Sequence, residues 1–142
     1  MFLCNQKRQK TMAETLIVAL GSNSNQEENI TKANNMILDI FGQENVEFSE
    51  TLWTEPIGLD SDKFLNQLAK IETAMDYAAI SKLLKDIEQQ LGAEKTLKRQ
   101  GVVYIDIDIL KLGNTIYHND DWHRTYVKKL YTSLLSNRHY AK

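Results

Sequence analysis

The alternation of apolar and polar residues along the chain predicts four strands and two helices. Short runs rich in branched apolar side chains, and stretches in which every second residue is apolar, are typical of buried and half-buried strands. These patterns predict strands at 15–20, 46–53, 64–75 and 104–113. Apolar residues spaced three and four apart predict helices over 27–41 and 77–91, each followed by a glycine that can end it.

The order of these elements, β-α-β-β-α-β, is that of a ferredoxin-like domain. Such an α+β domain has an antiparallel sheet with its helices packed on one face. We expect the domain to span residues 14–136, after a mobile N-terminal extension at 1–13 and before a C-terminal tail at 137–142. The last part of the domain shows only a weak helical pattern, which is made by Tyr126, Leu130 and Leu134.

The composition is that of an ordinary globular domain and narrows the choice of partners. The 142 residues include 25% charged side chains and carry a formal net charge of -2, whereas nucleic-acid and membrane binding usually require a basic excess. The single cysteine, Cys4, excludes an internal disulfide and a zinc site made of cysteines. No apolar stretch has the length of a signal-peptide core or of a membrane span. We therefore expect a cytoplasmic monomer or weak homodimer whose partners are small molecules.

The strand predicted at 104–113 carries two aspartates, Asp106 and Asp108, within an apolar run. Because side chains alternate along a strand, Tyr104 and both aspartates share one face, and three isoleucines share the other. Carboxylates at this spacing lie roughly 6–7 Å apart. Magnesium favours one or two carboxylates together with substrate phosphates, so the pair suits a metal–nucleotide site. The alternative is that both aspartates are simply solvated on an open strand face.

Positive charges precede this strand, where a polyphosphate beside metal ions would need them. They are Lys82, Lys85, Lys95, Lys98 and Arg99, and the alternative is that they are ordinary solvated residues. The sequence contains no phosphate-binding P-loop, no dinucleotide fingerprint and no H-E-x-x-H motif. A bound nucleotide would therefore be held without a P-loop.

Short motifs occur together in the order and approximate spacing of a known enzyme family. They are ALGSN (19–23), TEPIG (54–58), FLN (64–66), IE (87–88) followed by QQLG, and IDIDIL (105–110). Over about residues 15–135 the chain thereby resembles the 6-hydroxymethyl-7,8-dihydropterin pyrophosphokinases. The resemblance implies a ferredoxin-like αβα sandwich. It also implies transfer of the β,γ-diphosphate of ATP to a pterin alcohol in folate biosynthesis, with two Mg²⁺ ions.

The resemblance also implies roles for individual residues. Asp106 and Asp108 match the aspartates that hold the magnesium ions, and the basic loop would add Lys95 and Arg99 to the catalytic centre. The pterin would be bound by Thr54, Pro56, Ile57, Phe64, Asn66 and Tyr131. The nucleotide would meet Lys98, His123 and Lys129. The assignments of His123, Lys129 and Tyr131 require a short deletion after Ile116. Without that deletion, His123 and Tyr131 are ordinary residues of an additional helix.

Lys129 stands where the family usually has an arginine, and three further positions depart from the family's pattern. Gln100 and Val103 stand where the family has the tryptophan and the second arginine of R-W-G-P-R, and Ala93 stands where an arginine usually follows the second helix. These changes remove charge-assisted contacts from a reaction that depends on positioning and electrostatics. Lysines of the basic loop can reach a phosphate, but they lack the bidentate fork of arginine.

Three hypotheses about function follow. The first is a working pterin pyrophosphokinase, which would form AMP from ATP and the pterin. The second is a catalytically degenerate relative, which a pterin or nucleotide would stabilise without product formation. The third is a ferredoxin-like domain for interaction or sensing, in which both aspartates are merely exposed. A structure without a pocket beside Asn66 would favour the third.

Overall fold

The computed structural model describes residues 12–56, 62–92 and 99–140. Its strands are β1 (Glu14–Ser22), β2 (Val46–Phe48), β3 (Leu52–Thr54), β4 (Phe64–Thr73), β5 (Asp106–Leu112) and β6 (Thr115–Ile116). Its helices are α2 (Gln26–Phe41), α3 (Tyr77–Gln90), α5 (Asn119–Trp122) and α6 (Thr125–Tyr140), and η1 (Gln43–Asn45) is a short 3-10 turn. The predicted strand–helix order is confirmed, and the two predicted helices end within one residue of their expected bounds.

All strand pairs are antiparallel and belong to one sheet. The order of strands is β2-β4-β1-β5-β6, and β3 also pairs with β4. The single strand expected at 46–53 is therefore two strands, β2 and β3, on the same edge of β4. Ser49 separates them because its Oγ accepts the Leu68 N–H at 2.9 Å, while its own N–H donates to the Leu68 carbonyl. A side-chain oxygen takes the place of a backbone acceptor, and the edge strand bulges.

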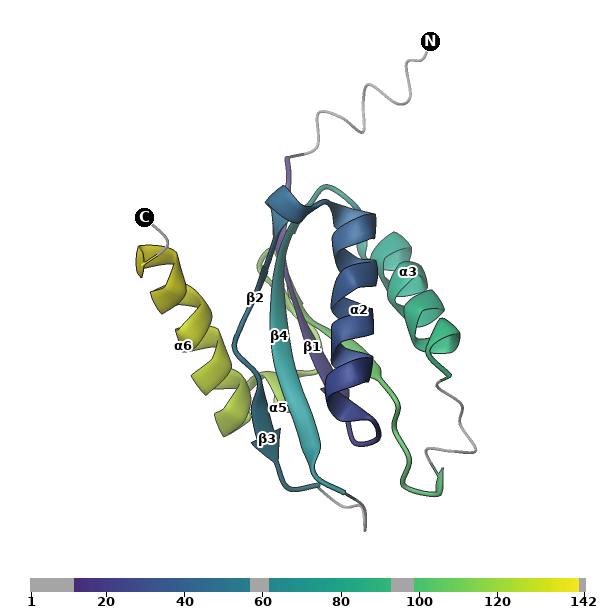
Figure 1. Ribbon diagram of the computed structural model, residues 1–142. Coiled ribbons are helices and arrows are strands. Elements are labelled where there is room, and N and C mark those ends of the chain that lie inside the picture. The colour runs from purple at the N-terminus through teal and green to yellow at the C-terminus, as the bar shows by residue number, and fades with distance from the viewer. Residues whose placement is uncertain (1–11, 57–61, 93–98, 141–142) are drawn as a thin grey trace.

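Helices cover both faces of the sheet (Figure 1). On one face α2 and α3 pack over a core that includes Ile105, Ile107 and Ile109, as the alternation predicted. On the other face α6 packs over a second core made by Ile17, Leu68, Leu110, Trp122, Val127, Leu130 and Leu134. The expectation that helices cover only one face is therefore wrong. The sheet has a second apolar patch, which the weakly patterned tail buries by forming a helix, and the result is the αβα sandwich that the resemblance implied.

The aspartate-bearing strand begins later than expected, at Asp106, so that Tyr104 precedes it. β1 is its partner, and Gly21 lies opposite Asp106. A bulge interrupts this pairing at Leu110, which is buried in the core under α6. Asp106 and Asp108 precede Leu110 on the same face of β5, and both are partly exposed. One face of β5 therefore passes from apolar core to a polar site within three residues.

The structure describes the first strand and the last helix of the domain. β1 begins at Glu14, and residues 1–11 of the expected extension lie outside the described residues. α6 continues to Tyr140 and runs past residue 136, where the domain was expected to end. In the described part of the chain, no helix combines the length and the apolar character needed to cross a membrane.

Candidate active site

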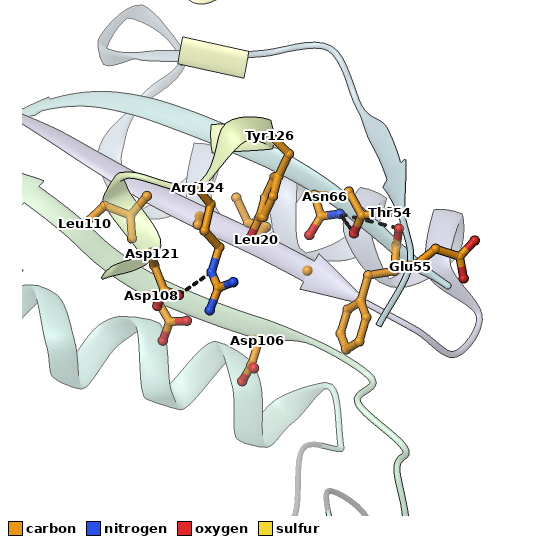
Figure 2. Close-up of a pocket in the computed structure, with 13 residues that line it drawn as sticks. Leu20, Thr54, Glu55, Asn66, Asp106, Asp108, Leu110, Asp121, Arg124 and Tyr126 are labelled. Carbon is orange, nitrogen blue, oxygen red and sulfur yellow. Dashed lines mark hydrogen bonds and ion pairs between the residues drawn. The ribbon is translucent and has the colours of Figure 1, made fainter. Parts of the chain in front are cut away.

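A cavity of about 250 Å³, which we call the sheet cavity, opens beside the two aspartates on the α6 face of the sheet (Figure 2). It is lined by Ala19, Leu20 and Gly21 of β1, Thr54 and Glu55 at the end of β3, Phe64 and Asn66 of β4, Asp106, Asp108 and Leu110 of β5, and Asp121, Arg124 and Tyr126 around the start of α6. Four motifs that lie far apart in the sequence therefore meet in this cavity.

Asn66 is held rigidly in the wall of the sheet cavity. Its Nδ2 donates to Thr54 Oγ1 at 2.7 Å and to the Leu52 carbonyl at 3.1 Å, as Figure 2 shows for Thr54. The residue is only 5% exposed, so these bonds satisfy the amide group of a nearly buried side chain. Because both amide protons are used, Oδ1 is the group that remains to accept a hydrogen bond from a ligand.

Gly21 keeps the sheet cavity open between Asn66 and Phe64. A Cβ at this position would lie 3.4 Å from Asn66 Oδ1 and 3.6 Å from a ring carbon of Phe64. Those are ordinary van der Waals distances, so the added atom would fit the fold but would occupy space beside the ligand-binding groups. Gly21 is not among the glycines with positive φ. The site therefore needs this glycine for space and not for an unusual backbone conformation.

A second cavity of about 160 Å³, the α3 cavity, lies between β5 and α3. It is lined by Tyr77, Ser81, Leu84, Lys85 and Glu88 of α3, Asp106, Ile107, Asp108 and Ile109 of β5, and His118. Asp106 and Asp108 line both cavities, and we call this pair the common wall. Lys85 lines the α3 cavity and Arg124 lines the sheet cavity, so each cavity brings a cation to the side of these carboxylates.

Two sets of hydrogen bonds hold the aspartate strand in place. Glu88 Oε2 accepts the Ile107 N–H at 2.7 Å, which ties the backbone between the two aspartates to α3. Asn23 Oδ1 accepts the Val103 N–H at 2.7 Å, and Asn23 Nδ2 donates to the Gly101 carbonyl at 2.8 Å. The buried asparagine of the ALGSN motif thereby anchors the segment that leads into β5.

Arg124 is the cation of the sheet cavity. Its Nε donates to Asp121 Oδ1 at 2.8 Å (Figure 2), and this hydrogen bond raises the pKa of the guanidinium. The same two groups form an ion pair at this distance. The bond to Asp121 uses Nε and not the two Nη groups, which are donors of the kind that an anion can accept from.

Tyr126 lines the same cavity from the first turn of α6. Burial raises the pKa of its phenol, and the nearby carboxylate of Asp121 raises it further. The hydroxyl is therefore neutral at physiological pH and can both donate and accept a hydrogen bond. Its ring offers a flat apolar surface to a ligand.

The structure places His123, Lys129 and Tyr131, which were expected at the substrate site, in different surroundings. His123 and Lys129 line a wide groove of about 570 Å³ beside the sheet cavity, which Arg124 and Tyr126 border as well. Tyr131 lines none of the three hollows described here. Its ring meets Trp122 edge-on, with the ring centroids 5.3 Å apart, and packs against the core under α6.

Sequence reasoning missed four residues after Ile116 that line the two cavities. One is Asp121, and the other three are His118, Arg124 and Tyr126. These three follow one another at spacings of six and two residues, which are also the spacings of His123, Lys129 and Tyr131. If the family's histidine, arginine and aromatic positions are aligned five residues earlier in this chain, they fall on His118, Arg124 and Tyr126, which line the two cavities. The signal that could have found this alignment was the arginine itself, because the later alignment has a lysine at that position.

The other expected site residues also have distinct positions. Thr54, Phe64 and Asn66 line the sheet cavity, whereas Pro56 is partly buried and is not among its lining residues. Arg99 is exposed. Ile57, Lys95 and Lys98 lie outside the described residues.

The common wall has the chemistry of a magnesium site that a substrate completes. Within the described part of the chain, no group of three or more His, Cys, Asp or Glu side chains is placed to hold a metal ion. Two carboxylates are sufficient for Mg²⁺ when phosphate oxygens and water supply its other ligands. Asp106 and Asp108 therefore fit a metal–nucleotide complex better than a metal bound by protein alone.

The antiparallel sheet between two helical layers is that of a ferredoxin-like α+β domain, and the paired aspartates between two cavities are its candidate ligand site. The sequence model of the 7,8-dihydro-6-hydroxymethylpterin-pyrophosphokinase (HPPK) family matches residues 17–135. The chain therefore belongs to this family, and the resemblance of its motifs is confirmed.

Three curated relatives are named as folate synthesis proteins or as a pyrophosphokinase. The 2-amino-4-hydroxy-6-hydroxymethyldihydropteridine pyrophosphokinase of Haemophilus influenzae is 33% identical over 108 residues, which are 75% of this chain and 67% of that protein. The folate synthesis bifunctional protein of Arabidopsis thaliana is 31% identical over 127 residues. The folic acid synthesis protein fol1 of Schizosaccharomyces pombe is 31% identical over 116 residues. The chain covers 26% and 16% of these two longer proteins, respectively.

Proposed function

We propose that this chain transfers diphosphate from ATP to 6-hydroxymethyl-7,8-dihydropterin, with Mg²⁺, as a cytoplasmic step of folate biosynthesis. The observation that carries the proposal is the common wall, because Asp106 and Asp108 line both cavities. Diphosphate transfer requires an acceptor and a donor that approach each other at one charged centre. Two cavities that meet at paired carboxylates supply this arrangement.

The sheet cavity suits the pterin, which is a flat ring with hydrogen-bonding groups along its edge. Asn66 Oδ1 would accept a ring N–H. The Thr54 hydroxyl already accepts from Asn66, so its proton is available to a ring nitrogen or oxygen. Phe64 and Tyr126 offer aromatic surfaces against which the pterin can pack. In this proposal Tyr126 takes the role that the sequence assigned to Tyr131.

The α3 cavity suits the phosphates of ATP. Lys85 and His118 line it beside the carboxylates, and both can donate hydrogen bonds to phosphate oxygens. Mg²⁺, when bound at the common wall, neutralises phosphate charge and helps to orient the attacked phosphorus. Arg124 is held by Asp121 through Nε, and its Nη groups can stabilise the transferring phosphates from the side of the sheet cavity.

In the proposed reaction the hydroxymethyl oxygen of the pterin attacks the β-phosphorus of ATP. An oxygen–phosphorus bond forms while the bond from the β-phosphorus to the oxygen of the α-phosphate breaks, and AMP leaves with that oxygen. The hydroxyl proton passes to solvent. Positioning and electrostatics dominate such transfers, so the residues of the common wall and Arg124 contribute by holding both substrates in line.

Formation of AMP in the presence of ATP, Mg²⁺ and the pterin tests the proposal. Chromatography should detect AMP and the pterin diphosphate in equal amounts, and Asp106→Ala should form neither. Asp39→Asn is a matched control, because Asp39 is exposed on α2 and lines neither cavity. Its rate should equal that of the unaltered chain. Absence of AMP above background at high enzyme concentration would overturn the proposal.

A binding role without turnover is the second candidate, and the position of Val103 favours it. Val103 replaces an arginine of the family's pattern, is 5% exposed, and forms backbone hydrogen bonds with Asn23. This position therefore adds no charge to the site. A binder of this kind would show a higher Tm with pterin or nucleotide but no AMP. The cavity beside Asn66 argues against the third hypothesis, a domain without a ligand pocket.

A further inference from the structure

We propose that Tyr77 and Tyr117 form a stacking platform for the base of the bound nucleotide. The inference rests on the proposed function, because it assumes that the nucleotide's phosphates occupy the α3 cavity beside the common wall. The two side chains would bind the base, so they would favour a nucleotide over a polyphosphate that has no base.

The size of the α3 cavity requires part of the nucleotide to lie outside it. The volume of about 160 Å³ is only about half of the roughly 300 Å³ at which pockets for drug-sized ligands begin. Glu88, which is bonded to the backbone between the aspartates, and Lys85, one helix turn before it, line the cavity near the carboxylates, and they suit phosphates and a metal ion better than a flat base. The sugar and the base must therefore extend from that charged end toward the rim.

Helix geometry places Tyr77 far along the cavity wall from Glu88. Glu88 marks the charged end, because its Oε2 accepts the N–H of Ile107 between the two aspartates. Tyr77 is the first residue of α3, eleven residues before Glu88, and it lines the same cavity. At 1.5 Å per residue, about 16 Å of helix separate the two residues. That distance matches an extended triphosphate whose base reaches the first turn of α3.

Two aromatic rings from different elements are already stacked at this place. The centroids of Tyr77 and Tyr117 lie 4.4 Å apart, and the angle between the ring planes is 26°. Tyr117 is fixed, because its side chain packs against the core and its N–H donates to the Leu110 carbonyl at 2.8 Å. Tyr77 is 38% exposed and lines the cavity. A base can therefore extend the stack from Tyr77 without any rearrangement of the protein.

A ligand that has phosphates but no base separates this role from a purely structural one. Calorimetric titration of the full chain with Mg-ATP and with Mg-tripolyphosphate, both without pterin, compares the two ligands. Tyr77→Leu should weaken ATP binding about tenfold, as the loss of one base–aromatic stack predicts, and should leave tripolyphosphate binding unchanged. Tyr77→Phe keeps the ring and should bind both ligands like the unaltered chain. Because Tyr77 is exposed at the start of α3, both variants are expected to fold, and their Tm values check this.

The possible failures are distinguishable. Unchanged ATP binding by Tyr77→Leu, or equal weakening of both ligands, would overturn the stacking platform. The proposed enzyme function would survive that result, because the unaltered chain would still bind ATP. An unaltered chain that binds neither ligand in the presence of Mg²⁺ would overturn both proposals.

Discussion

The two cavities that meet at Asp106 and Asp108 are built by different means. The sheet cavity owes its shape to neutral hydrogen bonds around Asn66 and to the missing side chain of Gly21. The α3 cavity is lined mainly by charged and polar side chains, and Tyr77 is one of its lining residues. Neutral, rigid groups select a flat ring by shape and hydrogen bonding, whereas charges bind phosphates with little demand on shape. The comparison indicates that each cavity can be altered separately, except at the common wall.

The common wall should show the largest effect, because both cavities depend on it. Asp108→Asn keeps the shape of the side chain but removes one carboxylate. We expect the rate of AMP formation to fall at least about 100-fold, since charge at the reaction centre supplies much of the catalysis. A titration with Mg²⁺ at fixed ATP should show weaker metal dependence as well. A rate within about tenfold of the unaltered chain would show that the two cavities do not share this residue functionally.

Gly21→Ala should affect the sheet cavity alone. The new Cβ would contact Asn66 Oδ1 and Phe64 at ordinary distances, so the protein should keep its Tm. In the proposed function the same atom would occupy space that the pterin needs, and misplacement of a substrate by about 1 Å can cost roughly 100-fold in rate. Pterin binding measured by fluorescence should weaken strongly while ATP binding stays unchanged. Equal loss of both ligands would contradict the separation of the two cavities.

Arg124→Ala and Lys129→Ala form a matched pair that tests the tail. Each removes one cation, but only Arg124 lines the sheet cavity. Loss of a charge-assisted hydrogen bond worth about 1.5–3 kcal/mol predicts a fall in kcat/KM of roughly 10- to 150-fold for Arg124→Ala. Lys129→Ala should stay close to the unaltered value. The reverse result would restore the alignment that brings His123, Lys129 and Tyr131 to the substrates.

Tyr126→Phe should show the smallest effect, and it concerns the dependence of stability on pH. Burial raises the pKa of this phenol, so the folded chain keeps a proton that the unfolded chain loses near pH 10. The free energy of unfolding should therefore fall as the pH rises above about 10, and the phenol's contribution is fully present below that pH. Denaturant unfolding at several alkaline pH values should give a shallower fall for the phenylalanine variant. Identical slopes would show that burial does not perturb this hydroxyl.

Agreement between sequence and structure is best where the pattern is local. The two helices and the buried isoleucines beside the aspartates follow directly from spacing along the chain. The split of the second strand was not predictable in this way, because it depends on the Ser49 hydroxyl bonding to Leu68 on another strand. The sequence showed only a weak helical pattern for α6. This pattern is explained by the second apolar face of the sheet, which α6 buries.

The sequence by itself determined the family and the paired carboxylates, because motif order and strand periodicity are encoded along the chain. Only the tertiary structure decided that Asp106 and Asp108 stand between two cavities. It also placed Arg124 and Tyr126 along the sheet cavity, and His123 and Lys129 along the neighbouring groove. The physical reason is that a cavity is bounded by side chains from distant segments, and the packing of α3 and α6 against the sheet sets which of them meet. Val103, where the pattern has an arginine, lies buried for the same reason.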